Sequence, residues 1–145
     1  MELAGAGSEA NRAALLQHSP TGKVPALDDH ELGVTIRDSL AICEHIAECH
    51  PSAGLWPSDT SARAVARAVV MEMHSGFSAL RSAMPMNVRK RCPRYDLRTR
   101  GPACDVERIV QIWERCRAMH GSGGPFLFGA LCMMGVCMMD SRGVL

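Results

Sequence analysis

The chain has 145 residues, of which 47% are hydrophobic and 21% charged, a composition typical of a globular protein. Its net charge of +1 excludes a general electrostatic attraction to nucleic acid or membrane surfaces. The longest apolar run, residues 126–139, is shorter than the roughly 20 residues that cross a bilayer. The N-terminus lacks the features of a secretory signal, and the seven cysteines include no CxxC pair. We therefore expect a cytoplasmic protein with reduced thiols that binds neither nucleic acid nor membrane.

The first part of the chain predicts a helix, a hairpin and a second helix. A helix over Glu9–His18 stops at the turn sequence SPTG. Residues 23–27 and the β-branched residues 34–36 predict two short antiparallel strands, joined by a polar turn at 28–31. A helix then follows, with Asp38 and Ser39 at its cap, and ends before Pro51.

The rest of the chain predicts helices alone. After a linker with one anchoring aromatic residue, an alanine-rich helix is expected over about 61–83. A basic, proline-punctuated loop covers 87–103. Asp105 then looks like the N-cap of a third helix, which ends at the glycines of 121–124.

The stretch CEHIAECH, residues 43–50, combines cysteine, histidine and glutamate. On a helix, His45 and Cys49 share one side, but two ligands do not complete the tetrahedral set of a structural zinc site. We therefore expect no metal, with Cys43 acting as a small buried side chain and His45 on a solvated face.

The start of the same helix indicates a binding site. A serine at a helix N-terminus, beside free N–H groups and the positive end of the dipole, is suited to hold a carboxylate. Asp38 beside Ser39 adds a negative charge suited to an ammonium group. The pair predicts a receptor for an α-amino-acid head group; alternatively, it is only a helix cap.

Several separated motifs resemble the glutathione S-transferase family. They are SPTGKVPALDD, VTIRDSLAICEHIAE, RAVARAVVMEMHSGFSALRSAMPMNVR and DVERIVQIWERCRAMHGSGGPFLFG, within residues 9–129. The resemblance implies an α+β to mainly α fold. Residues 1–50 would form a partial thioredoxin-like domain without its first βαβ unit, and 51–60 a linker. Residues 61–129 would form an all-helical C-terminal-type domain, followed by a divergent Cys/Met-rich tail at 130–145.

The resemblance also implies where glutathione binds. The Val24–Pro25 bond would be cis, leaving the Val24 backbone to pair with the cysteinyl part of the tripeptide. Asp38 and Ser39 would take the γ-glutamyl head group, and Lys23 would reach the glycyl carboxylate.

Met71, His74 and Phe77 would line an acceptor pocket for a small hydrophobic electrophile. The alternative for this stripe is ordinary core. Glu72 and Arg81 are candidates for interdomain or dimer contacts, and a homodimer is the expected assembly.

The implied activity is conjugation of the glutathione thiol to an electrophile. The family's thiol-activating residue sits in a unit with no counterpart before residue 9, so no catalytic residue is assigned, Ser8 included. We expect a chain truncated at both ends relative to the family, from a shortened or frame-shifted gene copy. The alternative function is a non-catalytic protein that binds glutathione or a partner subunit at most.

Two further features have simple explanations. The sulfur-rich tail, with Cys132 and Cys137 among methionines, would suit Cu(I) but is more typical of apolar packing. The basic residues of 89–100 form a loop that we expect to be solvated rather than bound to phosphate.

Overall fold

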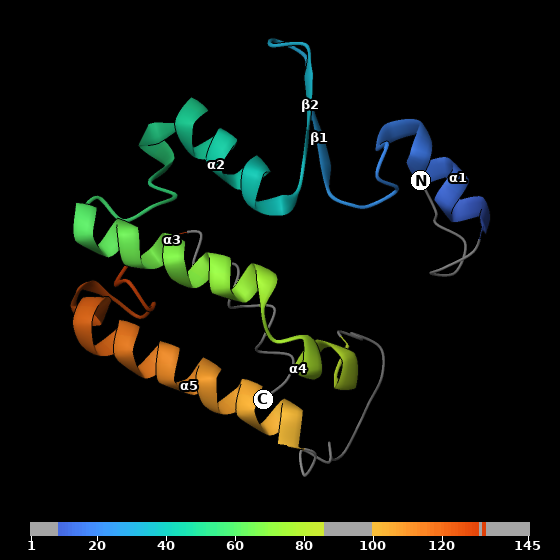
Figure 1. The fold of residues 1–145 in the computed structure, drawn as a ribbon. Coiled ribbons are helices and arrows are strands. Elements are labelled where there is room, and N and C mark those ends of the chain that lie inside the picture. The colour runs from blue at the N-terminus through green and yellow to red at the C-terminus, as the bar shows by residue number, and fades with distance from the viewer. Residues whose placement is uncertain (1–8, 86–99, 131, 133–145) are drawn as a thin grey trace. The chain divides into compact units, whose positions relative to one another are not determined.

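The computed structural model describes residues 9–85, 100–130 and 132, and it divides into two compact units (Figure 1). The first unit is Met1–Pro51 and the second is Ser52–Leu145. The first contains a β-hairpin and helices, whereas the described part of the second is helical apart from one isolated bridge. The predicted α+β to mainly α fold class is therefore confirmed.

The first unit opens with helix α1, Glu9–His18, at the predicted bounds. The predicted turn follows directly, and the Gly22 N–H donates to the Ser19 carbonyl at 2.8 Å. Gly22 has a φ of +63°, which glycine adopts without steric cost. The Ser19 hydroxyl is buried and lies 2.9 Å from the Thr21 hydroxyl, so the turn satisfies its own polar groups.

The hairpin pairs strand β1, Ala26–Asp29, with strand β2, Val34–Arg37. The strands are antiparallel, with Ala26 opposite Arg37 and Asp29 opposite Val34. The predicted hairpin is confirmed, but β1 begins after Pro25 rather than around it. The reason is that proline has no N–H to donate to the ladder.

Helix α2, Ser39–Cys49, is linked to the hairpin by the Asp29 side chain. Asp29 Oδ1 accepts the N–H groups of Glu31 and Leu32, each at 2.9 Å, and so closes the turn between the strands. Its Oδ2 accepts from His45 Nε2 at 2.8 Å. The expectation that His45 lies on a solvated face is wrong, because its side chain is only 18% exposed in this contact. Sequence spacing within the helix carries no information about a partner on the hairpin.

Local polar contacts of this kind matter because the first unit has little buried apolar surface. Among its described residues no hydrophobic side chain is fully buried, and the apolar face of α2 is half-buried. A two-stranded sheet is marginally stable in water by itself. The hairpin therefore depends on its turn and on the helix beside it.

The second unit shows that the predicted helix over 61–83 is two helices. A short turn, η1 Pro51–Ala53, precedes α3, Thr60–Ser75, and α4 covers Ser78–Ala83. Between them Phe77 has a φ of 61°, in the left-handed region, and its side chain is buried. The apolar spacing continues across this break, so periodicity alone misses it.

The third predicted helix begins earlier than expected. Helix α5 is Arg100–His120, and Asp105 lies inside it instead of capping it. Asp105 Oδ2 accepts the Leu80 N–H at 2.9 Å, so it serves the first turn of α4, whose own cap residue Phe77 offers no acceptor. The predicted end of the helix is confirmed, with η2, Gly121–Gly123, directly after it.

Helices α3, α4 and α5 share the hydrophobic core of the second unit. Its buried side chains include Ala66, Val70, Met73, Phe77, Leu80, Ile109, Ile112 and Cys116. At the rim of this core, Arg108 Nε and Nη2 donate to the two Glu72 carboxylate oxygens at 2.6 and 2.9 Å, which links α3 to α5. Arg81 donates to the Gly76 and Met73 carbonyls. Glu72 and Arg81 therefore make contacts inside the second unit, where the sequence predicted interdomain or dimer contacts.

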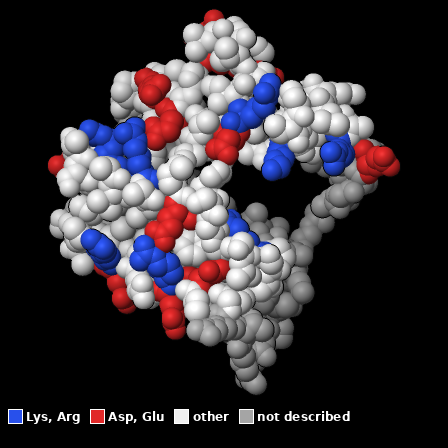
Figure 2. Space-filling model, viewed as in Figure 1, with Lys and Arg blue, Asp and Glu red and all other residues white. Residues whose placement is uncertain are grey.

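On the face shown in Figure 2, acidic and basic side chains of the described residues are interspersed. The predicted basic loop at 89–100 lies almost wholly outside the described residues. So does the tail at 130–145, except for Ala130 and buried Cys132. In the described ranges, no helix is long and apolar enough to cross a membrane.

The break between α3 and α4 gives a first prediction. A Cβ added to Gly76 would lie 2.7 Å from the Glu72 carbonyl oxygen, which also accepts the Gly76 N–H. We expect Gly76→Ala to lower the free energy of unfolding by about 1–2 kcal/mol, because the helix end must shift. Gly123→Ala is the control, since its Cβ would meet only the Gly129 Cα at 3.9 Å. Equal midpoints of denaturant unfolding for the two variants would contradict this account.

A second prediction concerns pH. The pKa of Asp29 is lowered, first by the hydrogen bond from the Leu32 N–H and then by the bond from His45. A carboxylate with a lowered folded-state pKa stabilises the fold above its unfolded value of about 4, and this stabilisation is lost as the pH falls through the folded value. We expect Asp29→Asn to be less stable than the wild type near neutral pH, with the gap closing below about pH 4. Denaturant unfolding across this range measures the gap, and a constant gap would refute the linkage.

Candidate functional site

The register of the hairpin brings two predicted binding segments to the same end of the sheet. Ala26 and Arg37 form the pair at the open end. Val24 and Pro25, which enter β1, and Ser39, which follows β2 after one residue, therefore lie at this end. In the sequence, the whole hairpin separates these two segments, and the pairing of β1 with β2 brings them to the same end.

The first segment presents an exposed backbone. The Val24–Pro25 peptide bond is cis, as the resemblance implies. Val24 is 69% exposed, and within the described residues its N–H and C=O have no hydrogen-bond partner. This is the arrangement that a peptide needs in order to pair with the chain as one more strand residue.

The second segment turns sharply at Asp38, which has φ 88° and ψ 129°. A positive φ is uncommon for a residue with a Cβ and carries strain. Three contacts hold it in place: Asp38 Oδ1 accepts the N–H groups of Leu40 and Ala41 at 2.9 and 3.4 Å, and its carbonyl accepts that of Ile42 at 3.0 Å. The predicted helix cap is confirmed.

Ser39 is the first residue of α2 and is exposed. The next three N–H groups of the helix go to Asp38, whereas the Ser39 N–H has no acceptor in the part of the chain that the structure describes. Its N–H and hydroxyl thus lie at the positive end of the helix dipole, where an anion is stabilised. The geometry is suited to a carboxylate.

Lys23 lies beside these segments and is exposed. Its N–H donates to the Thr21 hydroxyl at 3.3 Å, which ties its backbone to the preceding turn. Its role toward a second carboxylate stays a prediction.

The residues predicted for an acceptor pocket do not form one helical stripe. Met71 and His74 are exposed on α3, with Met71 at 51%, whereas Phe77 follows the helix break and is 8% exposed. Phe77 belongs to the core of the second unit. The pocket itself stays a prediction.

Thiols and metal ligands complete the inventory of the described residues. The pKa of Cys43 is raised by burial and by the charges of Glu44 and Asp38, so this thiol stays protonated at neutral pH. Among the described residues no three or more His, Cys, Asp or Glu side chains are grouped to hold a metal ion.

Ser8 lies outside the described residues. The sequence did not predict the contact of Asp29 with His45. The only sequence signal for a polar cluster at this place is the separation of His45 and Cys49 by one helical turn.

Comparison with known proteins agrees with the geometry of the first unit. Residues 4–49 match the family model of the glutathione S-transferase N-terminal domain. Over 73 residues the chain is 38% identical to a probable maleylacetoacetate isomerase of Caenorhabditis elegans. This alignment covers 50% of the chain and 33% of the relative, so the chain spans about a third of that protein.

A solved structure is also similar, a glutathione transferase homolog from Sulfitobacter with bound glutathione. It matches with a TM-score of 0.49 and 20% identity, over 86% of this chain and 58% of that one. The match of residues 4–49 identifies the hairpin and its flanking helices as part of a thioredoxin-like domain. Residues 4–49 of the chain are therefore similar to the N-terminal domain of the glutathione S-transferase family.

Proposed function

We propose that the chain binds glutathione at the open end of its hairpin and conjugates the glutathione thiol to a small hydrophobic electrophile. The observation that carries the proposal is the meeting of the exposed Val24 backbone with Ser39, the first residue of α2, at one end of the sheet. The match of residues 4–49 to the glutathione S-transferase N-terminal domain supports the choice of ligand.

Each part of the tripeptide has a counterpart in this proposal. The cysteinyl backbone pairs with Val24, which is 69% exposed. The γ-glutamyl carboxylate binds the N–H and hydroxyl of Ser39, and its ammonium group lies near the Asp38 carboxylate. Lys23 reaches the glycyl carboxylate.

The proposed division of labour follows the two parts of the chain. Residues 1–50 bind glutathione, 51–60 connect, and 61–129 contribute the acceptor pocket. Met71 and His74 supply its exposed surface, and Phe77 supports it from the core. The proposed setting is the cytoplasm, and the proposed assembly is a homodimer.

A non-catalytic function is the second candidate, and the composition of the site favours it. The five proposed binding residues include no imidazole, phenol or thiol to activate the glutathione thiol. A free thiol with a pKa near 8.5 is only a few per cent ionised at neutral pH, so conjugation without activation is slow. In this alternative the chain binds glutathione or a partner subunit without turnover.

Calorimetric titration with glutathione tests binding directly. We expect saturable binding to the wild type and an affinity at least about tenfold lower for Ser39→Ala, because one hydrogen bond to a charged group is worth about 1.5–3 kcal/mol. Thr60→Ala is the matched control, since Thr60 also follows an Asp cap at the start of a helix. Equal losses in both variants, or no binding by the folded wild type, would reject the site.

The two roles of Asp38 are separable by substitution. Asparagine keeps the capping oxygen, so Asp38→Asn retains stability, whereas Asp38→Ala lowers it by about 1 kcal/mol. Asparagine loses the charge, so we expect Asp38→Asn to bind glutathione more weakly than the wild type at equal stability. Unfolding midpoints measure the capping role, and glutathione titration of the same samples measures the binding role. An unchanged affinity of Asp38→Asn for glutathione would show that Asp38 does not bind the ammonium group.

Turnover decides between the two candidate functions. The wild type is mixed with glutathione and a generic aromatic electrophile, and product formation is compared with the uncatalysed rate. A rate above the background that Ser39→Ala lowers supports conjugation. Binding without such a rate supports the non-catalytic alternative.

A further inference from the structure

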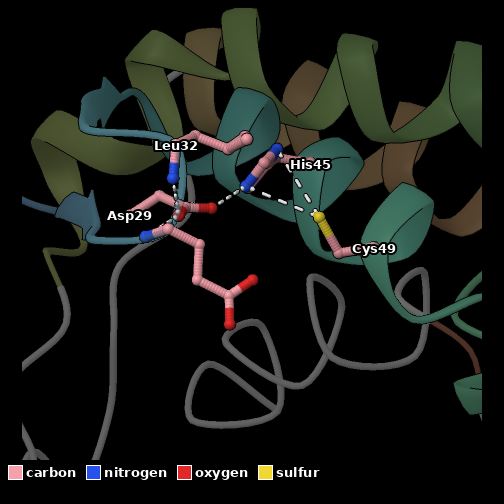
Figure 3. A network of polar contacts seen from close by, with 5 residues as sticks. Asp29, Leu32, His45 and Cys49 are labelled. Atoms are coloured by element: carbon pink, nitrogen blue, oxygen red, sulfur yellow. Dashed lines mark hydrogen bonds and ion pairs between the residues drawn. The ribbon is translucent and has the colours of Figure 1, made fainter.

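A carboxylate, an imidazole and a thiol lie next to one another at the side of α2: those of Asp29, His45 and Cys49 (Figure 3). Asp29 Oδ2 is 2.8 Å from His45 Nε2. Cys49 Sγ lies 3.7 Å from the same nitrogen and 3.9 Å from His45 Nδ1, within hydrogen-bond reach for sulfur. Cys49 is exposed, so a small reagent can approach its sulfur.

The Asp29 carboxylate is held rigidly and stays charged. Its Oδ1 is bound by two N–H groups of the hairpin turn, which leaves Oδ2 aimed at the ring (Figure 3). The same contacts lower the pKa of Asp29, the Leu32 N–H most and His45 next. The Asp29 carboxylate thereby fixes the orientation of the His45 ring.

Binding by Asp29 also selects the tautomer of His45. Nε2 donates its hydrogen to the carboxylate, so in the neutral ring Nδ1 carries the lone pair. This nitrogen is the one left to accept a proton from Cys49. The arrangement has the order that activates a nucleophile: a base beside the thiol and a third group that orients the base.

We propose that Cys49 is a reactive thiol that exchanges with small disulfides, with His45 as its proton acceptor and Asp29 as the positioning residue. In the exchange, Cys49 transfers its proton to His45 and its sulfur attacks one sulfur of the disulfide. The S–S bond of the reagent breaks and a mixed disulfide with Cys49 forms. The departing thiolate takes the proton from His45, so Cys49 is oxidised and half of the reagent is reduced.

Another cysteine of the same chain provides an internal comparison. Cys104 is also exposed, but it lies near the N-terminal end of α5, where the helix dipole favours a negative charge. Cys49 is the last residue of α2, where the dipole opposes one. If helix position alone set the reaction rate, Cys104 would react faster than Cys49. The proposal predicts that Cys49 reacts faster.

The test treats the folded, reduced protein with hydroxyethyl disulfide, an uncharged reagent. Peptide mass spectrometry after acid quenching follows each cysteine separately. We expect Cys49 to form the mixed disulfide about tenfold faster than Cys104, a gain set by thiolate fraction and nucleophilicity. Equal rates, or a faster Cys104, would overturn the proposal.

Substitution of His45 tests whether Cys49 reacts fast because His45 activates its thiol or only because the thiol is exposed. In His45→Gln we expect the Cys49 rate to fall to that of Cys104 or below, with the Cys104 rate unchanged. Loosening of the first unit would instead speed up half-buried Cys43 as well as Cys49. An unchanged Cys49 rate in a variant whose Cys43 stays slow would also overturn the proposal.

The role of Asp29 has its own readout. Asp29→Asn removes the charge, and we expect it to lower the ratio of the Cys49 and Cys104 rates. Asp29→Glu keeps a carboxylate and is expected to restore part of the ratio. Equal ratios for the two variants would remove Asp29 from the mechanism. The experiment needs no glutathione, so its outcome is independent of the proposed conjugation.

Discussion

The Asp29 carboxylate is the interaction on which the first unit depends. One oxygen closes the turn between β1 and β2, and the other binds His45 of α2. A two-stranded sheet with no fully buried hydrophobic side chain among its described residues has little else to hold its register. The register in turn decides that Val24 and Ser39 meet at the open end. A polar contact at one end of the hairpin thus supports the candidate site at the other.

At the open end of the hairpin, one residue has both a structural role and a proposed binding role. Asp38 adopts a positive φ, and its side chain caps the helix that it starts. Because those contacts take up the N–H groups of Leu40 and Ala41, the N–H of Ser39 is left at the surface. Backbone strain of this kind persists where surrounding bonds determine it, and it is common at binding sites. The helix cap and the proposed receptor for an amino-acid head group therefore depend on the same arrangement.

The second unit is stabilised differently. Its helices share a buried apolar core, and polar side chains complete the helix ends that the local sequence leaves unsatisfied. Asp105 of α5 accepts the Leu80 N–H where Phe77 offers no cap. Glu72 and Arg108 join α3 to α5 by two hydrogen bonds. These residues look like surface charges in the sequence, but they serve helix termination and packing.

Local sequence signals determined α1, the hairpin, the start of α2 and the glycine stop after α5, because turns, caps and β-branched runs act over a few residues. The motifs around Pro25 and Ser39 also indicated the family. Tertiary structure alone decided the break at Phe77, the early start of α5 and the partners of Asp105 and Glu72. It also decided that His45 faces Asp29 and Cys49 together. Each of these features depends on a residue distant in the sequence or on burial of a side chain in the core. Hydrophobic periodicity contains no information about either.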